Sequence, residues 1–262
     1  MNTTSFIILL ILIVLIYFTI KHYHLVNIIY NDLIYHLNSF NNCLDPIKNN
    51  NNELMNPKTH KNKILIITYD NRPELEYVKK HNDNLNEYVK KWGYKYIYYD
   101  KCNHNIYWCK IHMVLDALKS NEYDYVMWLD SDTIIKNIDI RLDDIVNKYA
   151  SDIIVGMDNH WPVINAGIFI IKNSLAGRQF LEDCISNLNP LCLNQNKTLK
   201  GLWSATCYEQ GNMNMFIRGK YLKNTTIVAN NLFFSYGNCR NDVFIMHLYG
   251  SSPEARMKCF SG

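Results

Sequence analysis

The sequence predicts an α/β domain with a mostly parallel sheet flanked by helices, preceded by an N-terminal transmembrane helix. Three observations lead to this prediction. From residue 63 onward, short apolar runs of strand type alternate with segments of helical spacing, which is typical of such sheets. Three of these runs end directly at an aspartate, namely Asp70, Asp100 and Asp130. Residues 6–20 form an uncharged apolar segment.

The apolar segment is interpreted as an uncleaved membrane anchor over residues 1–24. With Ser5 and Tyr23 added, the segment is just long enough to span a thin bilayer. A cleaved signal peptide would need a basic stretch before the apolar run and a small-residue cleavage site, and the sequence has neither. The lysines that follow favour a cytoplasmic C-terminal part, but a long folded domain crosses regardless of such charges. Charge therefore does not determine the orientation.

Residues 25–62 are predicted to form a stem or linker before a single domain at residues 63–262. From about residue 41 the stem is rich in Asn, Lys and Pro and has too little apolar content for a core. Residues 25–40 are mixed and fit a short amphipathic helix. The 27 basic and 24 acidic side chains of the chain are scattered, so nothing indicates nucleic acid as a partner.

The elements of the domain follow in order from residue 63. Five short runs are rich in β-branched and aromatic residues, which favours strands. They cover residues 63–69, 94–99, 125–129, 153–156 and 166–171. Apolar residues at helical spacing mark four other segments. These are residues 73–92, 107–120, 141–149 and 175–188. Ligands of such sheets bind beyond the carboxyl ends of the strands, so an aspartate there is a candidate ligand contact. Asp70 or Asp100 alone could instead cap the following helix.

Asp130 and Asp132 are the first candidates for a metal site. They follow the aromatic strand run at residues 125–129 and are separated by Ser131, an Asp-x-Asp (DxD) motif. Side chains two apart in a strand point to the same side, so both carboxylates can reach one divalent cation at the strand end. Enzymes hold nucleotide diphosphates through a hard cation bound by carboxylates and phosphate oxygens. A strand followed by an Asp-rich turn would have the same sequence.

Three later segments also place polar residues beside apolar ones. Asn165 precedes the run at residues 166–171, Glu209 and Gln210 open a helical segment, and His247 ends the apolar run that begins at residue 243. Neutral imidazole binds manganese as well as zinc, so His247 is a candidate third ligand. The alternative is that this histidine is a core or surface residue whose hydrogen bonds are made within the protein and that binds no metal.

The chain has eight cysteines, and none forms a Cys-x-x-Cys pair. This spacing does not fit a zinc ribbon or a thioredoxin-type site. The even count and the sequons at Asn2, Asn196 and Asn224 suit a lumenal domain with disulfides. Free buried cysteines in a reducing compartment would have the same sequence.

Five pieces of the sequence, in this order, resemble glycosyltransferase family 34, which contains fungal galactosyl- and mannosyltransferases and plant xyloglucan xylosyltransferases. They are Trp108-Cys109-Lys110, WLDSDTII at 128–135, NAGIFIIKNS at 165–174, Glu209-Gln210 and HLYG at 247–250. The resemblance covers roughly residues 63–253. It implies a Rossmann-like GT-A fold and a retaining hexosyl- or pentosyltransferase in glycan biosynthesis. It also implies a nucleotide-diphosphate-sugar donor, Mn²⁺ or another divalent cation as cofactor, and a glycan or glycoprotein acceptor.

The family also has a single-pass anchor (signal-anchor) and a stem, so the expected location is a Golgi or ER membrane with the catalytic domain in the lumen. Proteins of this family often work in membrane-bound complexes, and the oligomeric state of this chain stays open.

By the same resemblance, Asp130, Asp132 and His247 match the metal ligands. Gln210 matches the residue that faces the anomeric carbon, with Glu209 beside it, and Asp132 completes the expected catalytic set. The expected donor-binding residues are Asp70, Lys110, Asp130, Ser131, Asn165 and Gly250. Lys110 would equally fit a plain lysine on a helix surface.

One departure from the family concerns the loop after His-x-x-Gly, which usually carries a lysine toward the donor diphosphate. Here the loop is Ser251-Ser252-Pro253, with Arg256 and Lys258 further on. Either Arg256 or Lys258 supplies the positive charge from a shifted loop, or the metal alone neutralises the diphosphate. The second option predicts weaker donor binding or slow turnover.

Two other functional classes fit parts of the sequence. A metal-dependent phosphohydrolase could use the same Asp pair, but it would need a second cluster of ligands for a two-metal site, and no obvious one is present. A non-catalytic, membrane-anchored glycan-binding or assembly protein with a degenerate GT-A fold would account for the missing loop lysine. The intact Asp130, Asp132, Asn165, Gln210 and His247 favour the enzyme.

Overall fold

The computed structural model describes residues 62–158, 163–188, 192–194, 198–228, 232–235 and 239–261. All of them belong to one unit, His60–Gly262. No helix in these ranges combines the length and the apolar character that a membrane span requires. The anchor predicted at residues 1–24 and the stem up to residue 61 lie outside the described residues.

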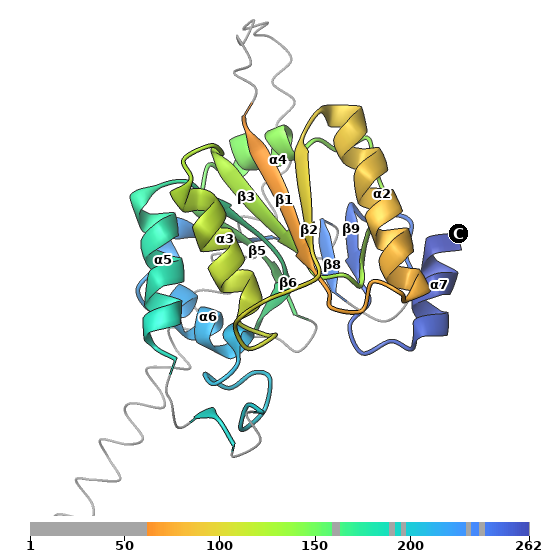
Figure 1. The fold of residues 1–262 in the computed structure, drawn as a ribbon. Helices are drawn as coiled ribbons and strands as arrows, with labels where there is room; N and C mark the ends of the chain where they lie inside the picture. Colours follow the sequence, from red (N-terminus) through yellow and green to blue (C-terminus); the bar gives the residue numbers. More distant parts are fainter. Residues whose placement is uncertain are drawn as a thin grey trace, which may run out of the picture. The chain divides into compact units, whose positions relative to one another are not determined.

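A six-stranded sheet forms the centre of the unit (Figure 1). Its strands are β1 (Ile64–Tyr69), β2 (Lys95–Tyr99), β3 (Tyr125–Leu129), β5 (Ile153–Met157), β6 (Ile164–Lys172) and β7 (Thr225–Val228), in the order β2-β1-β3-β6-β5-β7. β1 pairs in parallel with β2 and β3, and β5 with β7, whereas β6 is antiparallel to both of its neighbours. The predicted mostly parallel sheet is therefore confirmed, with β6 as its antiparallel member.

Helices cover both faces of this sheet, as predicted (Figure 1). One face packs against α3 (Cys109–Lys119), α5 (Leu175–Ser186) and α6 (Glu209–Arg218), and the other against α2 (Glu76–Trp92) and α4 (Leu142–Tyr149). β1 shows why the central strands are apolar throughout: Leu65 and Ile67 face the α3 side, and Ile64 and Ile66 face the α2 side. Burial on both faces removes the polar alternation of a half-exposed strand.

A small second sheet was not predicted from the sequence. It consists of β4 (Thr133–Ile135), β9 (Ile245–His247) and β8 (Phe233–Ser235), in the order β4-β9-β8. β9 is antiparallel to β4 and parallel to β8. The unit is completed by a 3-10 turn, η2 (Leu222–Asn224), and by α7 (Pro253–Ser261), which packs beside α2. Three-residue strands lack the period that identifies a strand, so only their pairing reveals them.

The strands and helices predicted between residues 63 and 188 are all present, with boundaries that differ by up to three residues. The largest shift is at α2, which begins at Glu76 rather than Pro73, because Leu75 still has an extended backbone. α2 ends where Gly93 adopts φ 73°, a left-handed conformation that costs glycine little.

Three disulfides are present among the described residues, joining Cys102 to Cys109, Cys192 to Cys207 and Cys239 to Cys259. Cys184 is a buried free thiol in α5. The third disulfide ties the chain before β9 to α7.

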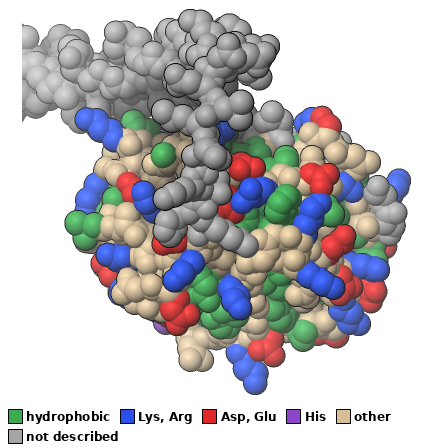
Figure 2. Space-filling model, turned by 90° about the horizontal axis from the view of Figure 1, so that it is seen from above, with side chains coloured by type: hydrophobic (Ala, Val, Ile, Leu, Met, Phe, Trp, Pro, Cys, Tyr) green, Lys and Arg blue, Asp and Glu red, His purple; other side chains and the backbone are tan. Residues whose placement is uncertain are grey.

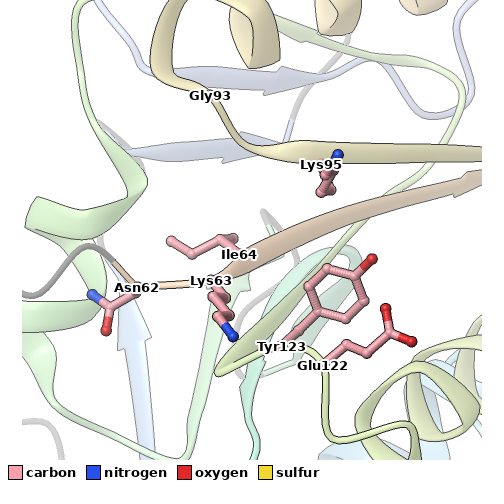
Figure 3. A pocket seen from close by; sticks show the side chains of 7 residues that line it. All are labelled: Asn62, Lys63, Ile64, Gly93, Lys95, Glu122 and Tyr123. Atoms are coloured by element: carbon pink, nitrogen blue, oxygen red, sulfur yellow. The ribbon is translucent and has the colours of Figure 1, made fainter.

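The amino-terminal ends of β1 and β2 border a cavity of about 460 Å³. The strand-end aspartates lie at the opposite, carboxyl ends of the strands. Figure 3 shows its lining: Asn62, Lys63, Ile64, Gly93, Lys95, Glu122 and Tyr123. Figure 2 views the molecule from above Figure 1, and there Lys and Arg side chains are interspersed with Asp and Glu. The face in view therefore has no large patch of a single charge sign.

Candidate active site

Asp130 and Asp132 lie in the turn between β3 and β4. The turn is fixed by two hydrogen bonds, from the N–H of Asp130 to the carbonyl of Gly167 (2.9 Å) and from the N–H of Thr133 to the carbonyl of Asp130 (3.0 Å). Ligand atoms of Asp130, Asp132 and His247 all lie within 4.8 Å of one another. The structure thus brings together the three residues that the sequence proposed as metal ligands.

The pairing of β4 with β9 brings His247 to the Asp pair, because Thr133 lies opposite His247 in the register. The Nε2 atom of His247 is 3.0 Å from Oδ1 of Asp132 and 3.6 Å from Oδ2 of Asp130. Two residues distant in the sequence therefore meet through one antiparallel ladder.

Asn165 fixes the orientation of the His247 ring. Its Oδ1 accepts a hydrogen bond from the N–H of Gly167 (2.9 Å), and its Nδ2 donates to Oδ2 of Asp158 (3.1 Å). The same Oδ1 lies 2.8 Å from Nδ1 of His247, so Nδ1 must carry the proton of that bond. Nε2, which faces the two carboxylates, then carries no proton in the neutral ring. This is the tautomer that binding a metal through Nε2 requires.

Gly167 makes room for this ring. A Cβ atom at position 167 would lie 2.1 Å from Cε1 of His247. Any side chain there would displace the imidazole. The glycine in the NAG segment is therefore explained by the close approach of a side chain rather than by its own backbone conformation.

Lys110 neutralises Asp130 from inside the protein. It is 6% exposed, and its Nζ lies 2.9 Å from Oδ1 of Asp130 and 3.2 Å from Oε1 of Glu209. Trp128 also donates its indole N–H to Asp130 (2.6 Å). Burial alone would lower the pKa of Lys110, but Asp130 and Glu209 outweigh it and raise that pKa, so Lys110 stays charged. It is a buried residue, not a helix-surface lysine.

Glu209 lies at the start of α6, almost fully buried. Burial raises its pKa above the usual range, although Lys110 opposes this effect. Its Oε2 has no hydrogen-bond partner among the described residues. Beside it, Gln210 accepts a hydrogen bond from the N–H of Ala166 through Oε1 (2.9 Å), so its carbonyl already has one donor.

Arg256 of α7 balances the charge of Asp132. Its Nη2 donates to Oδ2 of Asp132 at 2.8 Å, while Oδ1 of the same carboxylate faces His247. Burial alone would raise the pKa of Asp132, but His247 and Arg256 hold it well below its usual range. Burial likewise would lower the pKa of His247, and Asp132 more than compensates and raises it.

Asp70 caps no helix, since Leu75 holds the N-cap position of α2. It accepts two hydrogen bonds from the Arg72 guanidinium, at 2.9 and 2.8 Å, and one from the Ser131 hydroxyl. Burial would raise the pKa of Asp70, but Arg72 and Ser131 lower it below the usual value. Ser131 thereby ties the end of β1 to the turn after β3.

Two cavities meet at the Asp pair. They share Tyr107, Lys110, Asp130 and Asp132. The first, about 300 Å³, is further lined by Asp158, Asn165, Trp203, Tyr208, Glu209, Gln210, His247 and Tyr249. The second, about 590 Å³, is further lined by Tyr69, Asp70, Asn71, Arg72, Ile106, Trp128, Ser131, Gly250 and Arg256. Every residue of the expected metal-binding, catalytic and donor-binding sets lines one of them, whereas Asp100 and Lys258 line neither.

Sequence reasoning missed three residues of this site. Trp128 and Arg72 contact the carboxylates of Asp130 and Asp70, and Asp158 holds Asn165. Of the three, only Trp128 could have been predicted from the sequence. It lies two residues before Asp130, so its side chain points to the same side of the strand. The other two contacts depend on loop conformations that no sequence period records.

Comparison with known proteins identifies the family that the chain resembles. Residues 58–150 match the model of the galactosyl transferase GMA12/MNN10 family, which confirms the resemblance to glycosyltransferase family 34 over this part of the chain. Galactomannan galactosyltransferase 1 from Cyamopsis tetragonoloba is 25% identical over 115 residues, which are 39% of this chain and 26% of that protein. Probable glycosyltransferase 7 from Oryza sativa subsp. indica is 30% identical over 85 residues, which are 29% of this chain and 19% of that protein. The matches thus span about a quarter or less of these relatives.

A solved structure shares the fold. A glycosyltransferase involved in the glycosylation of the major capsid of PBCV-1 superposes with a TM-score of 0.60 at 16% sequence identity, covering 76% of this chain and 98% of that chain. The two chains thus share a mixed α/β architecture with a mostly parallel central sheet.

Proposed function

We propose that this chain is a metal-dependent retaining glycosyltransferase, and the match of residues 58–150 to the galactosyl transferase GMA12/MNN10 family supports this proposal. It moves a hexose or pentose from a nucleotide-diphosphate sugar to a glycan hydroxyl. The observation that carries this proposal is the convergence of Asp130, Asp132 and His247 within 4.8 Å at the carboxyl end of β3.

The three side chains fit a divalent cation such as Mn²⁺. They offer carboxylate oxygens and one imidazole nitrogen that already faces those oxygens, a donor set that suits manganese. A cation bound there supplies a Lewis acid for the departing diphosphate. Lys110, Arg256 and Asn165 hold the three ligands in place before any substrate arrives. Such preorganisation removes the cost of arranging charges during the reaction.

The two cavities suit different parts of the substrates. Arg72 and Arg256 line the larger cavity beside the strand ends, which fits a nucleotide and its diphosphate. Aromatic side chains line the smaller one, among them Trp203 and Tyr208, together with Gln210. Flat apolar rings with polar neighbours suit the sugar and its acceptor. The anomeric carbon would lie near the residues that both cavities share.

Two mechanisms retain the configuration at the anomeric carbon, and the site fits front-face attack by the acceptor better than a covalent glycosyl–enzyme intermediate. Glu209 is the one carboxylate of the proposed catalytic set beside Gln210, and its Oε1 is ion-paired with buried Lys110. A carboxylate held by an ammonium group is a weaker nucleophile. In the proposed reaction the leaving phosphate takes the acceptor proton, and Gln210 stabilises positive charge at the sugar.

A pair of variants tests this mechanism. We expect Asp132→Ala to have no measurable transfer, because it removes a metal ligand and the partner of Arg256. Glu209→Ala is expected to retain substantial activity. The measurement is the initial rate of sugar transfer at saturating donor and Mn²⁺. The reverse ranking would favour a covalent glycosyl–enzyme intermediate on Glu209.

The activity itself is tested with the purified protein, Mn²⁺ and a panel of nucleotide sugars. We expect release of a nucleoside diphosphate from at least one donor, stimulated by a glycan acceptor and abolished by a chelator. Asp132→Ala is the control for contaminating activity. Release of inorganic phosphate instead would indicate a phosphohydrolase, and donor binding without turnover would indicate a non-catalytic glycan-binding or assembly protein.

The cellular context is part of the same proposal. The apolar segment at residues 6–20 would anchor the chain in a Golgi or ER membrane, with the catalytic unit in the lumen. Protease treatment of sealed microsomes checks this: the catalytic unit should be protected until detergent is added. Digestion without detergent would place it in the cytoplasm.

A further inference from the structure

We propose that Arg256 is a ligand of the donor diphosphate and supplies the positive charge that the loop after Gly250 lacks. This inference rests on the proposed function. The loop of residues 251–253 contains no basic residue, and Arg256 is the first one after His247. Arg256 lies on α7, outside both sheets, so only the tertiary structure shows whether its side chain reaches the site.

The Arg256 side chain reaches from α7 to the centre of the site. It is 14% exposed and donates from Nη2 to Oδ2 of Asp132 at 2.8 Å. It also lines the larger cavity, as do Lys110 and Arg72. Each of these three cations pairs with a different carboxylate of the site: Lys110 with Asp130, Arg72 with Asp70 and Arg256 with Asp132. Arg256 is thus the cation that lies beside the second carboxylate of the pair.

Two further contacts hold the guanidinium in this position. Nε of Arg256 donates to the carbonyl of Leu248 (3.3 Å), and the guanidinium carbon lies 4.7 Å from the centroid of the Tyr77 ring. A guanidinium has five N–H donors in a planar fork, and these contacts use only part of them. The remaining donors are at the wall of a cavity, where a diphosphate would find a fork that matches its oxygens.

Asp132 divides its two oxygens between two partners, since Oδ1 faces His247 and Oδ2 accepts from Arg256. Oδ1, which lies 3.0 Å from Nε2 of His247, is the oxygen that a metal shared with His247 would bind. Arg256 therefore does not need to leave Asp132 for a metal to bind there. Its charge stays beside the place where the leaving diphosphate becomes more negative.

The position of α7 is itself secured. The disulfide between Cys239 and Cys259 ties the helix to the segment before β9, and Nζ of Lys136 donates to the carbonyl of Cys259 (3.1 Å). Lys258 lies on the same helix but is exposed and lines neither cavity. Of the two basic residues after the loop, the structure therefore favours Arg256, and Lys258 provides a matched control.

Calorimetric titration with nucleotides tests the proposal. Uridine and guanosine diphosphates, and the matching monophosphates, are titrated in Mn²⁺ into the wild type, Arg256→Ala, Arg256→Lys and Lys258→Ala. We expect Arg256→Ala to weaken diphosphate binding about tenfold to a hundredfold, the size of a lost charge-assisted hydrogen bond. Monophosphate binding should change much less, Arg256→Lys should recover part of the loss, and Lys258→Ala should match the wild type.

The alternative role for Arg256 is to hold Asp132 without touching the donor. In that case Arg256→Ala would weaken diphosphate and monophosphate equally and would weaken Mn²⁺ binding without nucleotide, which would overturn the proposal. Circular dichroism of each variant shows whether the fold is intact. If the wild type bound no nucleotide with Mn²⁺ present, the proposed function itself would fall, an outcome distinct from a wild type that binds and an Arg256→Ala variant that binds equally well.

Discussion

At the scale of single residues, the site consists of side chains that fix one another. Asn165 orients His247, Lys110 holds Asp130, and Arg256 holds Asp132. Each acidic residue of the pair therefore has its own buried or half-buried cation. A carboxylate pair without such partners would repel itself, because like charges at short range disfavour ionisation.

Gly167 gives the sharpest test at this scale. We expect Gly167→Ala to displace the His247 ring, since the new Cβ would lie 2.1 Å from Cε1. Mn²⁺ affinity should fall about tenfold to a hundredfold, the range found when a residue that orients a metal ligand is changed. Titration calorimetry with Mn²⁺ measures the affinity, and thermal unfolding shows whether the fold persists.

A double variant shows whether Gly167 acts through His247. Gly167→Ala in a His247→Ala background should cause no further loss of Mn²⁺ affinity, because the displaced ring is already absent. Additive losses in the double variant would contradict the explanation and would point to a general distortion of β6.

At the scale of elements, the ladder between β4 and β9 assembles the site, whereas α4 stabilises the opposite end of the sheet. Asp143 in the first turn of α4 is buried and accepts hydrogen bonds from the Tyr94 hydroxyl (2.7 Å) and the Asn62 N–H (3.0 Å). It thereby connects α4 to the residues that precede β1 and β2. This end of the unit contains no proposed catalytic group.

The pKa of Asp143 predicts a pH-dependent contribution to stability. Burial alone would raise this pKa, but Tyr94, Asn62 and Arg141 lower it below its usual value. A lowered native-state pKa stabilises the fold above the unfolded-state pKa of about 3.9, and this stabilisation is lost as the pH falls through the native value. Asp143→Asn should therefore lower the free energy of unfolding at pH 7 by about 1–3 kcal/mol, and the difference should shrink below about pH 4.

Urea unfolding of both proteins across this pH range measures the effect. Asp144→Asn is the matched control, because Asp144 is adjacent but exposed, and it should change the free energy of unfolding by less than about 0.5 kcal/mol. A difference between wild type and Asp143→Asn that stayed constant down to acidic pH would show that the carboxylate charge is not the cause.

At the scale of the whole molecule, the fold places two adjoining cavities at the carboxyl ends of the strands. Arg256, on the C-terminal helix, lines the larger cavity, and the segment before α6 contributes Trp203 and Tyr208 to the smaller one. Tyr107 contacts Tyr208 edge to face, with ring centroids 4.9 Å apart. The disulfide between Cys192 and Cys207 closes the loop that carries Trp203.

Trp203 tests the proposed division between donor and acceptor. Its side chain is 43% exposed at the smaller cavity. We expect Trp203→Ala to raise the KM for the glycan acceptor by roughly threefold to tenfold through the loss of one aromatic contact. The affinity for the nucleoside diphosphate should not change. Initial rates over a range of acceptor concentrations and calorimetry with the diphosphate give the two quantities.

Leu202 is the control for Trp203, because it is adjacent, 72% exposed and lines neither cavity. Leu202→Ala should leave the acceptor KM at the wild-type value. An increase in diphosphate Kd for Trp203→Ala with an unchanged acceptor KM would reverse the assignment of the two cavities.

The sequence by itself determined the alternation of strands and helices, the position of the Asp pair at a strand end and the candidacy of His247. These features are local: strand and helix periods, and apolar runs that end in polar residues, are written in neighbouring residues. The domain bounds, the membrane anchor and the roles of the site residues stay predictions.

Only the tertiary structure decided how the parts meet. The short strands β4 and β8 carry no detectable period, yet the pairing of β4 with β9 is what places His247 beside Asp132. Burial of Lys110 and the reach of Arg256 from α7 likewise depend on packing between distant segments. Contacts of this kind arise from long-range burial and pairing, which no local pattern in the sequence encodes.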